Sequence, residues 1–304
     1  MQKQKFAIPG ILIGCIVFGL GSLIVAHVPV GAYAIAFWRL LIAAIIFFIL
    51  AKVFKQPFPK SKLAIRYALL AGVFLAFDLG FWHESVYAVG PGISTLLNSL
   101  QIFFLAAIGF FYFKEKQSAV QLFSLVLAVI GVYLITGSEF QHNDNALWGF
   151  VSGVASSLLL ALSMVYIRKT HEAEPCAIFP LMLLVSVGGI LALIIPSLLF
   201  NFDNLYPTTA LDWFWVFVYG AVMQCFAWGM IAYSVPLLSL AVTGLLLLSE
   251  PIAALVIDYS VLDKPINLIQ WGGAAITMLA IYLGSVSSQP KKSKIRSLKG
   301  QNKG

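Results

Sequence analysis

Long apolar runs separated by short polar segments fill almost the whole chain. A helix rises about 1.5 Å per residue and the hydrocarbon core of a bilayer is about 30 Å thick, so a span needs about 20 apolar residues. Lipid offers no partner for an unpaired backbone group, and the runs do not alternate as barrel strands do. We therefore expect an all-α integral membrane protein with ten transmembrane helices, over roughly 8–27, 30–53, 66–87, 91–113, 118–137, 145–168, 177–200, 212–232, 237–258 and 268–287.

The composition agrees with lipid as the main solvent. Hydrophobic residues make up 61% of the chain and charged residues only 10%, whereas soluble domains carry about 25% charged residues. The three cysteines, Cys15, Cys176 and Cys225, show neither a disulfide framework nor the spacing of metal ligands. We interpret them as small hydrophobic residues of the protein interior.

The positions of the basic residues predict the orientation of the chain. If the N-terminus is cytoplasmic, all of the 19 basic residues except Arg39 and Lys264 fall at the two ends or in loops on the cytoplasmic side. Such a bias sets the topology of most membrane proteins. We expect both termini in the cytoplasm. The net charge of +7 then reflects orientation, and no nucleic acid is expected as a partner.

Segment 91–134 is echoed by segment 239–283. Each has a helix of small and aliphatic residues, an acid-plus-lysine turn (Glu115-Lys116 or Asp263-Lys264) and a helix that closes in Tyr-Leu. Five helices per half is an odd number, so the second copy must be inverted relative to the first, as in many secondary transporters. The expected units are two five-helix repeats and a basic cytoplasmic tail, at 1–138, 145–287 and 288–304.

With these features the chain resembles the drug/metabolite transporter superfamily, specifically its EamA branch. The resemblance covers essentially the whole chain and is carried by the stretch 87–101, Phe37-Trp38-Arg39-Leu40, Phe113-Lys114-Glu115-Lys116 and Ser249-Glu250-Pro251. It implies a secondary transporter that exports or imports small metabolites such as amino acids by alternating access. For this chain we expect export, driven by the gradient of the solute itself or by protons. The first helix carries no acid, whereas the four-helix multidrug relatives rely on a glutamate there, so their proton–drug exchange cannot be transferred to this chain.

Three charged residues inside the predicted spans need a reason, because an ionisable side chain there costs about 2.5–3.5 kcal/mol on insertion scales. Arg39 could clamp a carboxylate or phosphate of the solute, or form a structural ion pair. Asp78, near the midplane, could pair with Arg39 or bind a proton or an amino group. Glu250 precedes Pro251, where a broken helix would leave polar groups facing a cavity. All three are candidates for solute binding, and the two acids are also candidates for proton coupling.

Two amides and two indoles extend this candidate solute site. Asn98 and Gln101 are three residues apart and share a helix face, so both could bind solute or hold helices together. Trp82 and Trp228 could wall an apolar or aromatic solute. The resemblance favours a cavity-lining role for the two amides.

His83 and Glu84 lie further towards the outer side of the third predicted span. They could couple proton movement to transport, or simply mark the outer end of the helix. The four histidines are scattered without the spacing of metal ligands, so no metal site is expected.

The sequence contains no phosphate-binding glycine loop, no His-Glu-x-x-His helix and no Gly-x-Ser-x-Gly elbow. We therefore expect neither an enzyme, with no catalytic residues, nor a cofactor. The expected partners are a small solute and the lipid bilayer, and a homodimer is possible. The expected location is the bacterial inner (plasma) membrane. Multidrug or toxic-compound efflux and a non-transporting membrane scaffold remain as alternatives. An intramembrane lipid enzyme would need an acid–base or metal cluster at one interface.

Overall fold

The computed structural model describes residues 2–136, 145–260 and 267–287, and within these ranges the chain forms helices and no strands. The predicted Asp263-Lys264 turn and the basic tail 288–304 lie outside the described residues. The α-helices are α1 (Gln2–Gly19), α2 (Gly21–His27), α3 (Ala32–Val53), α4 (Lys62–Ser99), α5 (Gln101–Phe111), α6 (Ala119–Thr136), α7 (Ala146–Ala173), α8 (Ile178–Phe200), α9 (Ala210–Val218), α10 (Gly229–Ser234), α11 (Leu240–Leu247), α12 (Ser249–Ser260) and α13 (Leu268–Ser287). A π-helix, η3 (Tyr219–Trp228), joins α9 to α10, and short 3₁₀ turns occur at η2 (Phe202–Asn204) and η4 (Val235–Leu237).

Among the described residues, six helical stretches are long and apolar enough to cross a membrane: Phe6–His27, Ala32–Val53, Lys62–Gly90, Leu147–Ala173, Ile178–Phe200 and Ala210–Leu237. Four shorter apolar helices lie in the other four predicted runs, at Leu97–Phe111, Ala119–Gly131, Leu240–Ala253 and Leu268–Gly284. The prediction of an all-α membrane protein is therefore confirmed, and the number of ten spans stays a prediction.

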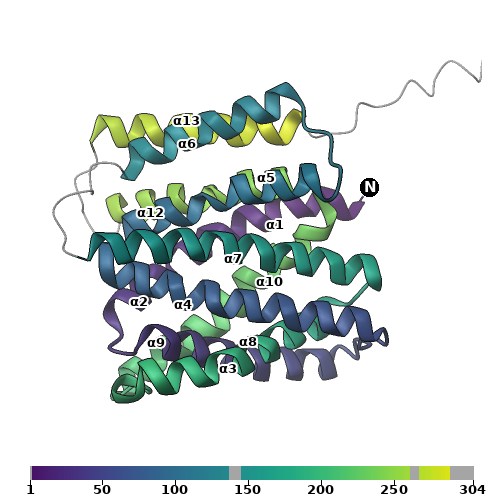
Figure 1. Cartoon of the computed structure of the whole chain (residues 1–304), viewed down its shortest axis with the longest axis vertical. Coiled ribbons are helices and arrows are strands. Elements are labelled where there is room, and N and C mark those ends of the chain that lie inside the picture. Colours follow the sequence, from purple (N-terminus) through teal and green to yellow (C-terminus); the bar gives the residue numbers. More distant parts are fainter. Residues whose placement is uncertain (1, 137–144, 261–266, 288–304) are drawn as a thin grey trace, which may run out of the picture.

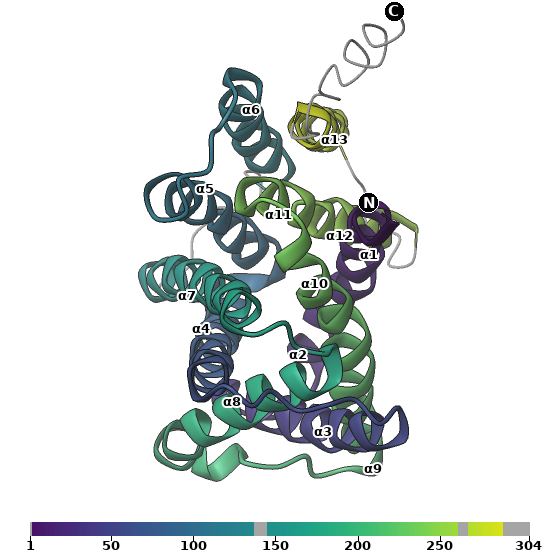
Figure 2. The same ribbon diagram turned by 90° about the vertical axis from the view of Figure 1, so that its right-hand side faces the viewer.

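Most helices run side by side with nearly parallel axes (Figure 1), and the view along those axes separates them clearly (Figure 2). The pair α6 and α13 lies at one end of the molecule, and α3, α8 and α9 lie at the other. Helices that are distant in sequence pack together: α4 on α7, α3 on α8, α5 on α11, and α1 on both α10 and α12. The polar residues described below lie among these central packed helices.

Glycines allow α4 and α8 to touch along their backbones. A Cβ atom added at Gly72 would overlap the carbonyl group of Val185, and one added at Gly188 would overlap the carbonyl group of Leu69. Without a hydrophobic driving force between helices in lipid, such close backbone contact is a main source of association. The two helices therefore form one tightly packed pair, and α3 packs against the same α8.

One set of helix ends is joined at the side of the bundle predicted to be extracellular. Asn201, after α8, accepts hydrogen bonds from the backbone N–H groups of Tyr33 (2.8 Å) and Ala34 (3.3 Å) at the start of α3. These donors have no partner inside the helix, so Asn201 caps α3 from a distant part of the chain. The indole N–H of Trp38 donates to the carbonyl oxygen of Leu205 at 2.8 Å, which ties α3 to the same linker.

The opposite set of helix ends is joined through Glu174. Its carboxylate accepts from the backbone N–H of Ser61 at 2.7 Å and of Lys60 at 2.9 Å, just before α4. These hydrogen bonds favour the charged form and hold the pKa of Glu174 below its usual value. The side chain of Gln56 accepts from the N–H of Phe179 at 3.0 Å, linking the end of α3 to the start of α8. The segments predicted to share the cytoplasmic side therefore lie together.

Three of the helix interruptions in the described residues lie near predicted site residues. Gly90 has φ +83°, a value that L side chains rarely adopt, and reverses the chain within α4. Leu100 separates α4 from α5, and Leu248 separates α11 from α12. The break predicted at Pro251 is present but lies three residues earlier, because a proline fits the first turn of the new helix α12.

Candidate functional site

Arg39 is the centre of a buried polar cluster. Its side chain is only 1% exposed. Its Nε donates to Oε1 of Gln224 at 2.7 Å and its Nη1 donates to the hydroxyl of Tyr219 at 2.6 Å. The guanidinium carbon also lies 4.4 Å from the ring centroid of Tyr219 and 4.8 Å from that of Phe18. Two aromatic rings and two hydrogen bonds therefore hold the cation in place inside the bundle.

The π-helix η3 brings the partners of Arg39 onto one face. Its i→i+5 hydrogen bonds widen the turn, so residues four and five apart point in the same direction. The buried positions follow this spacing: Tyr219, Gly220, Met223, Gln224, Ala227 and Trp228. A regular α-helix would rotate these side chains progressively around its axis. Short π segments occur frequently at functional sites, and here the segment supplies Tyr219, Gln224 and Trp228 to the cluster.

His83 extends the cluster towards the start of α3. It is fully buried, with Nδ1 2.8 Å from the carbonyl oxygen of Ala32 and Nε2 2.8 Å from the hydroxyl of Tyr219. A carbonyl oxygen can only accept, so Nδ1 carries a proton. The hydroxyl hydrogen of Tyr219 is free to point at Nε2, because Tyr219 accepts from Arg39. His83 is thus part of the arginine cluster.

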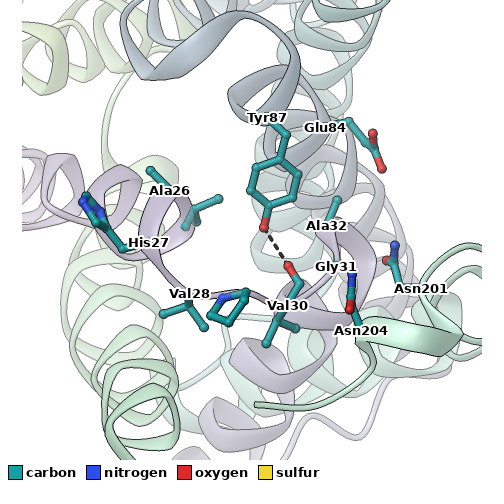
Figure 3. A pocket seen from close by; sticks show the side chains of 12 residues that line it. Ala26, His27, Val28, Val30, Gly31, Ala32, Glu84, Tyr87, Asn201 and Asn204 are labelled. Atoms are coloured by element: carbon teal, nitrogen blue, oxygen red, sulfur yellow. Dashed lines mark hydrogen bonds between the residues drawn. The ribbon is translucent and has the colours of Figure 1, made fainter. Parts of the chain in front are cut away.

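Glu84, the next residue, lies apart from this cluster. It is half-buried and accepts a hydrogen bond from the indole N–H of Trp148 at 3.2 Å. It lines a separate pocket of about 440 Å³ at the helix ends joined by Asn201, with His27, Tyr87, Asn201 and Asn204 (Figure 3). We call this the outer pocket. Tyr87 donates to the carbonyl oxygen of Val30 at 2.8 Å across this pocket (Figure 3).

Two acids complete the central cluster. Asp78 is 4% exposed, and its Oδ1 accepts from the hydroxyl of Ser156 at 2.6 Å. The same hydroxyl lies 3.5 Å from Oδ1 of Asn98, so α4 and α7 meet there through polar atoms. Glu250 is 9% exposed, at the start of α12, and interacts electrostatically with both Asp78 and Arg39.

The ion pair considered between Arg39 and Asp78 does not form. Within the described ranges, the salt bridges are those of Arg168 with Glu115 and with Glu172. Arg39 is instead hydrogen-bonded to neutral groups, because its Nε and Nη1 donate to Gln224 and Tyr219. The positive and negative charges of the cluster are therefore separated and available to different groups.

Several buried polar atoms of the cluster have no hydrogen-bond partner in the described part of the chain. Leaving such an atom unpaired costs about 1–3 kcal/mol, and each one needs an explanation. These atoms are the donors Nη2 of Arg39, Nε2 of Gln224 and Nε1 of Trp228. Oε1 of Gln101, at the start of α5, is also buried and without a partner in the described residues. An anionic group of a ligand beside Arg39 would supply acceptors for such donors.

The aromatic candidates divide between different surroundings. Trp228 packs beside Phe18, with ring centroids 6.1 Å apart, and Phe18 in turn contacts the Arg39 guanidinium. Trp82 is 4% exposed and lies in an apolar cluster with Val28, Ile35 and other residues at the outer helix ends, although its indole N–H is also unpaired.

A second polar cluster lies at the opposite helix ends from the outer pocket. Glu115 is hydrogen-bonded to Arg168 and also accepts from the backbone N–H of Leu240 at 3.2 Å. Leu240 begins α11, so the carboxylate sits at a helix N-terminus, where a negative charge is stabilised. The guanidinium carbon of Arg168 lies 4.2 Å from the ring centroid of Phe113. The contacts of Glu115 with Arg168 and with the N–H of Leu240 tie the turn after α5 to the end of α7 and the start of α11. We call these two contacts the inner latch.

Sequence reasoning did not find Tyr219, Gln224, Ser156 or Phe18. Gln224 carried a usable signal, because an amide inside an apolar run is unusual. Tyr219, Ser156 and Phe18 are common in membrane helices, and only the tertiary arrangement reveals their role. Among the described residues, no group of three or more His, Cys, Asp or Glu side chains is arranged to hold a metal ion.

Comparison with known proteins identifies relatives over most of the chain. The model of the EamA-like transporter family matches residues 5–137 and 147–286. The uncharacterized transporter YetK of Bacillus subtilis is 26% identical over 278 residues, which are 87% of this chain and 81% of that protein. A probable amino-acid metabolite efflux pump of Salmonella typhimurium is 23% identical over 80% of this chain and 84% of its own length.

The fold also has a counterpart among solved structures. One protein crystal structure aligns with a TM-score of 0.77, covering 95% of this chain and 100% of the other, at 11% identity. At that identity the likeness concerns the fold alone. The arrangement of helices is therefore one that occurs in an experimentally determined protein.

Proposed function

The chain belongs to the EamA-like transporter family, and we propose that it is a secondary transporter that exports amino-acid-like metabolites by alternating access. The family is one of transporters, which agrees with the expectation that the protein is not an enzyme. Its curated bacterial relatives include a protein described as a probable amino-acid metabolite efflux pump. The proposal for this chain rests on its own central cluster.

The observation that carries the proposal is that the central cluster contains unpaired hydrogen-bond donors in one part and two buried carboxyl groups in another. The free donors of Arg39, Gln224 and Trp228 match a carboxylate, which accepts several hydrogen bonds. The buried carboxyl groups of Asp78 and Glu250 match an ammonium group. A zwitterion carrying both groups would satisfy both ends of the cluster at once. The same acids are the groups available for proton coupling.

The internal repeats support a ten-span, 5+5 inverted arrangement with units at 1–138 and 145–287. The helix breaks at Leu100 and Leu248 occur at corresponding places in the two echoing segments. Helix contacts also relate the halves, because α3 packs on α8, α5 on α11 and α6 on α13. Discontinuous helices at the repeat interface are where secondary transporters bind their solutes.

We further propose that the protein lies in a bacterial inner membrane with both termini in the cytoplasm. Its curated relatives include several bacterial proteins. The helix ends joined by Glu174 and by the inner latch are those that carry most of the basic residues. Positive charge concentrates on the cytoplasmic side of membrane proteins.

Alternating access needs a contact that closes one side and can be released. The inner latch has this character, because Glu115 joins the first half of the chain to Arg168 and α11 of the second half. The outer pocket at Glu84 and Tyr87 lies at the opposite helix ends. We infer that the structure corresponds to a state closed towards the cytoplasm, in which the latch must open to admit solute.

Replacing Glu115 with glutamine should open the cytoplasmic side more often. Charge-assisted hydrogen bonds contribute about 1.5–3 kcal/mol each, so losing the carboxylate should shift the population about tenfold. We would measure the rate at which a water-soluble maleimide labels Cys15, which is fully buried beside Ser249. The protein would carry Cys176→Ser and Cys225→Ser, so that Cys15 is its one remaining cysteine. Inside-out vesicles present the cytoplasmic side to the maleimide.

Glu172→Gln is the matched control for this experiment. Glu172 also pairs with Arg168, at 3.2 Å, but it is half exposed and does not bind α11. It should leave the labelling rate near that of the parent protein. Equal rates for Glu115→Gln and Glu172→Gln would contradict the latch.

The transport proposal is tested by thermal stabilisation of the purified protein with amino acids, monocarboxylic acids and polyamines at two pH values. A ligand that binds only the folded protein raises its apparent stability by mass action. We expect amino acids to give the largest shift, since the other two classes each satisfy one end of the cluster. Asp78→Asn should reduce this shift and its dependence on pH. Stabilisation by acids or polyamines alone, or by none of the three, would overturn the assignment.

A further inference from the structure

A groove at the surface of the helices lies apart from the residues of the central cluster. A groove of about 320 Å³ separates α5 from α7. Five apolar residues form most of its lining: Ala107, Ile108, Phe111, Leu162 and Val165. Tyr112, Tyr166 and Lys169 complete it. On α7 the lining residues are spaced by three and four, so they form one stripe along the helix.

The cytoplasmic end of this groove carries a cation held by aromatic rings. The ammonium nitrogen of Lys169 lies 4.3 Å from the ring centroid of Tyr112, 5.1 Å from that of Tyr166 and 5.7 Å from that of Tyr67. Such contacts orient an ammonium group without neutralising its charge. The lysine is therefore positioned at the groove and still carries a full positive charge.

Positive charge is in excess at this end of the groove. Arg168, the neighbouring residue, is paired with both Glu115 and Glu172. In the described segments no salt bridge reaches Lys169. Lys114 and Lys116 follow α5 directly and are exposed. This end of the groove consequently attracts anions.

The groove is also open at the surface of the bundle. Phe111, the last residue of α5, is 70% exposed and Tyr112, the next residue, is 61% exposed, and both lie in the predicted span 91–113. An apolar surface topped by a cation at the membrane boundary matches one kind of molecule, an acyl chain joined to a negatively charged headgroup. Basic pockets between membrane helices on the cytoplasmic side suit anionic lipid headgroups.

We propose that the groove between α5 and α7 binds an anionic glycerophospholipid, with its phosphate at Lys169 and an acyl chain along Leu162 and Phe111. This inference does not depend on what the central cluster transports. It requires only that α5 and α7 lie in the membrane.

The test compares lipid adducts by native mass spectrometry of the purified full chain in detergent. Phosphatidylglycerol and phosphatidylcholine are added in equal amounts. We expect one phosphatidylglycerol to be retained preferentially. A basic residue near a membrane surface contributes about 1 kcal/mol of lipid attraction, so Lys169→Ala should reduce that preference about fivefold. The adduct with phosphatidylcholine should change little.

Lys52→Ala is the matched control. Lys52 ends α3 on the same side of the bundle, and its ammonium nitrogen also lies over a ring, 5.6 Å from the centroid of Phe48. It does not line the groove, so its removal should leave the preference unchanged. A second variant, Ala107→Trp, keeps every charge and fills the exposed apolar groove, and it should also remove the retained lipid.

Three outcomes would overturn the proposal. One is equal retention of the two lipids by the parent protein. Another is an equal loss of preference in Lys169→Ala and Lys52→Ala. The third is displacement of the lipid by millimolar inorganic phosphate, which would assign the site to a free anion. Thermal melting of each variant confirms that it is folded before the adducts are compared.

Discussion

Arg39→Ala should reduce solute transport by the purified protein in liposomes by about a hundredfold. Two charge-assisted hydrogen bonds of about 1.5–3 kcal/mol each end on this side chain, and one rate factor of ten corresponds to about 1.4 kcal/mol. The substitution also leaves Gln224 and Tyr219 without their buried partner and removes the cation between Phe18 and Tyr219. The carboxylate of a bound solute would lose its principal donor.

Arg39→Lys and Arg66→Ala separate the role of the guanidinium from that of charge. Lysine keeps the positive charge, but it lacks the planar fork that bonds Gln224 and Tyr219 together, so its activity should lie between those of the parent and Arg39→Ala. Arg66 is exposed near the start of α4, and its replacement should leave transport unchanged. Transport at the parent rate by folded Arg39→Ala protein would remove the central cluster from the mechanism.

Gly72→Ala should destabilise the protein by about 3 kcal/mol or more, the upper end of the cost of overpacking a well-packed core. The added methyl group would overlap the backbone carbonyl of Val185, and neither α4 nor α8 can yield without moving its whole length. We expect a clearly lower melting temperature and a reduced yield of folded protein in detergent.

Gly272→Ala provides the same chemical change at an open position. A Cβ atom at Gly272, in α13, meets no atom within 4 Å. Alanine is a better helix former than glycine by up to about 1 kcal/mol, so this variant should be neutral or slightly stabilised. Similar melting temperatures for the two variants would show that α4 and α8 are not in backbone contact.

The helices themselves were largely predictable, because lipid imposes one rule on every backbone group. Apolar runs such as 30–53 and 177–200 coincide closely with α3 and α8. The interruptions of the helices were harder to predict from the sequence. Pro251 drew attention to the ninth run, yet the actual break falls at Leu248, and nothing comparable marks the break at Leu100.

The candidate site was predictable only where a residue is costly in lipid. Arg39, Asp78 and Glu250 stood out for this reason, and the structure places them within electrostatic reach of one another. Their partners did not stand out, because a tyrosine or serine is inexpensive in a membrane helix. The position of His83 depended on which face of α4 meets Tyr219, and a single helix does not contain that information.

The π-helix η3 has a consequence for how sequences of this kind can vary in length. A π segment arises when a helix accommodates one additional residue without changing what lies before and after it. Removing one residue between Tyr219 and Trp228 would let an ordinary α-helix form there and keep α9 and α10 intact. The deletion would rotate Gln224, inside the segment, away from Arg39, so a chain shortened by one residue at this point would fold and yet lose its solute. Among relatives, a single-residue gap confined to this segment would therefore mark a change of substrate rather than a loss of structure.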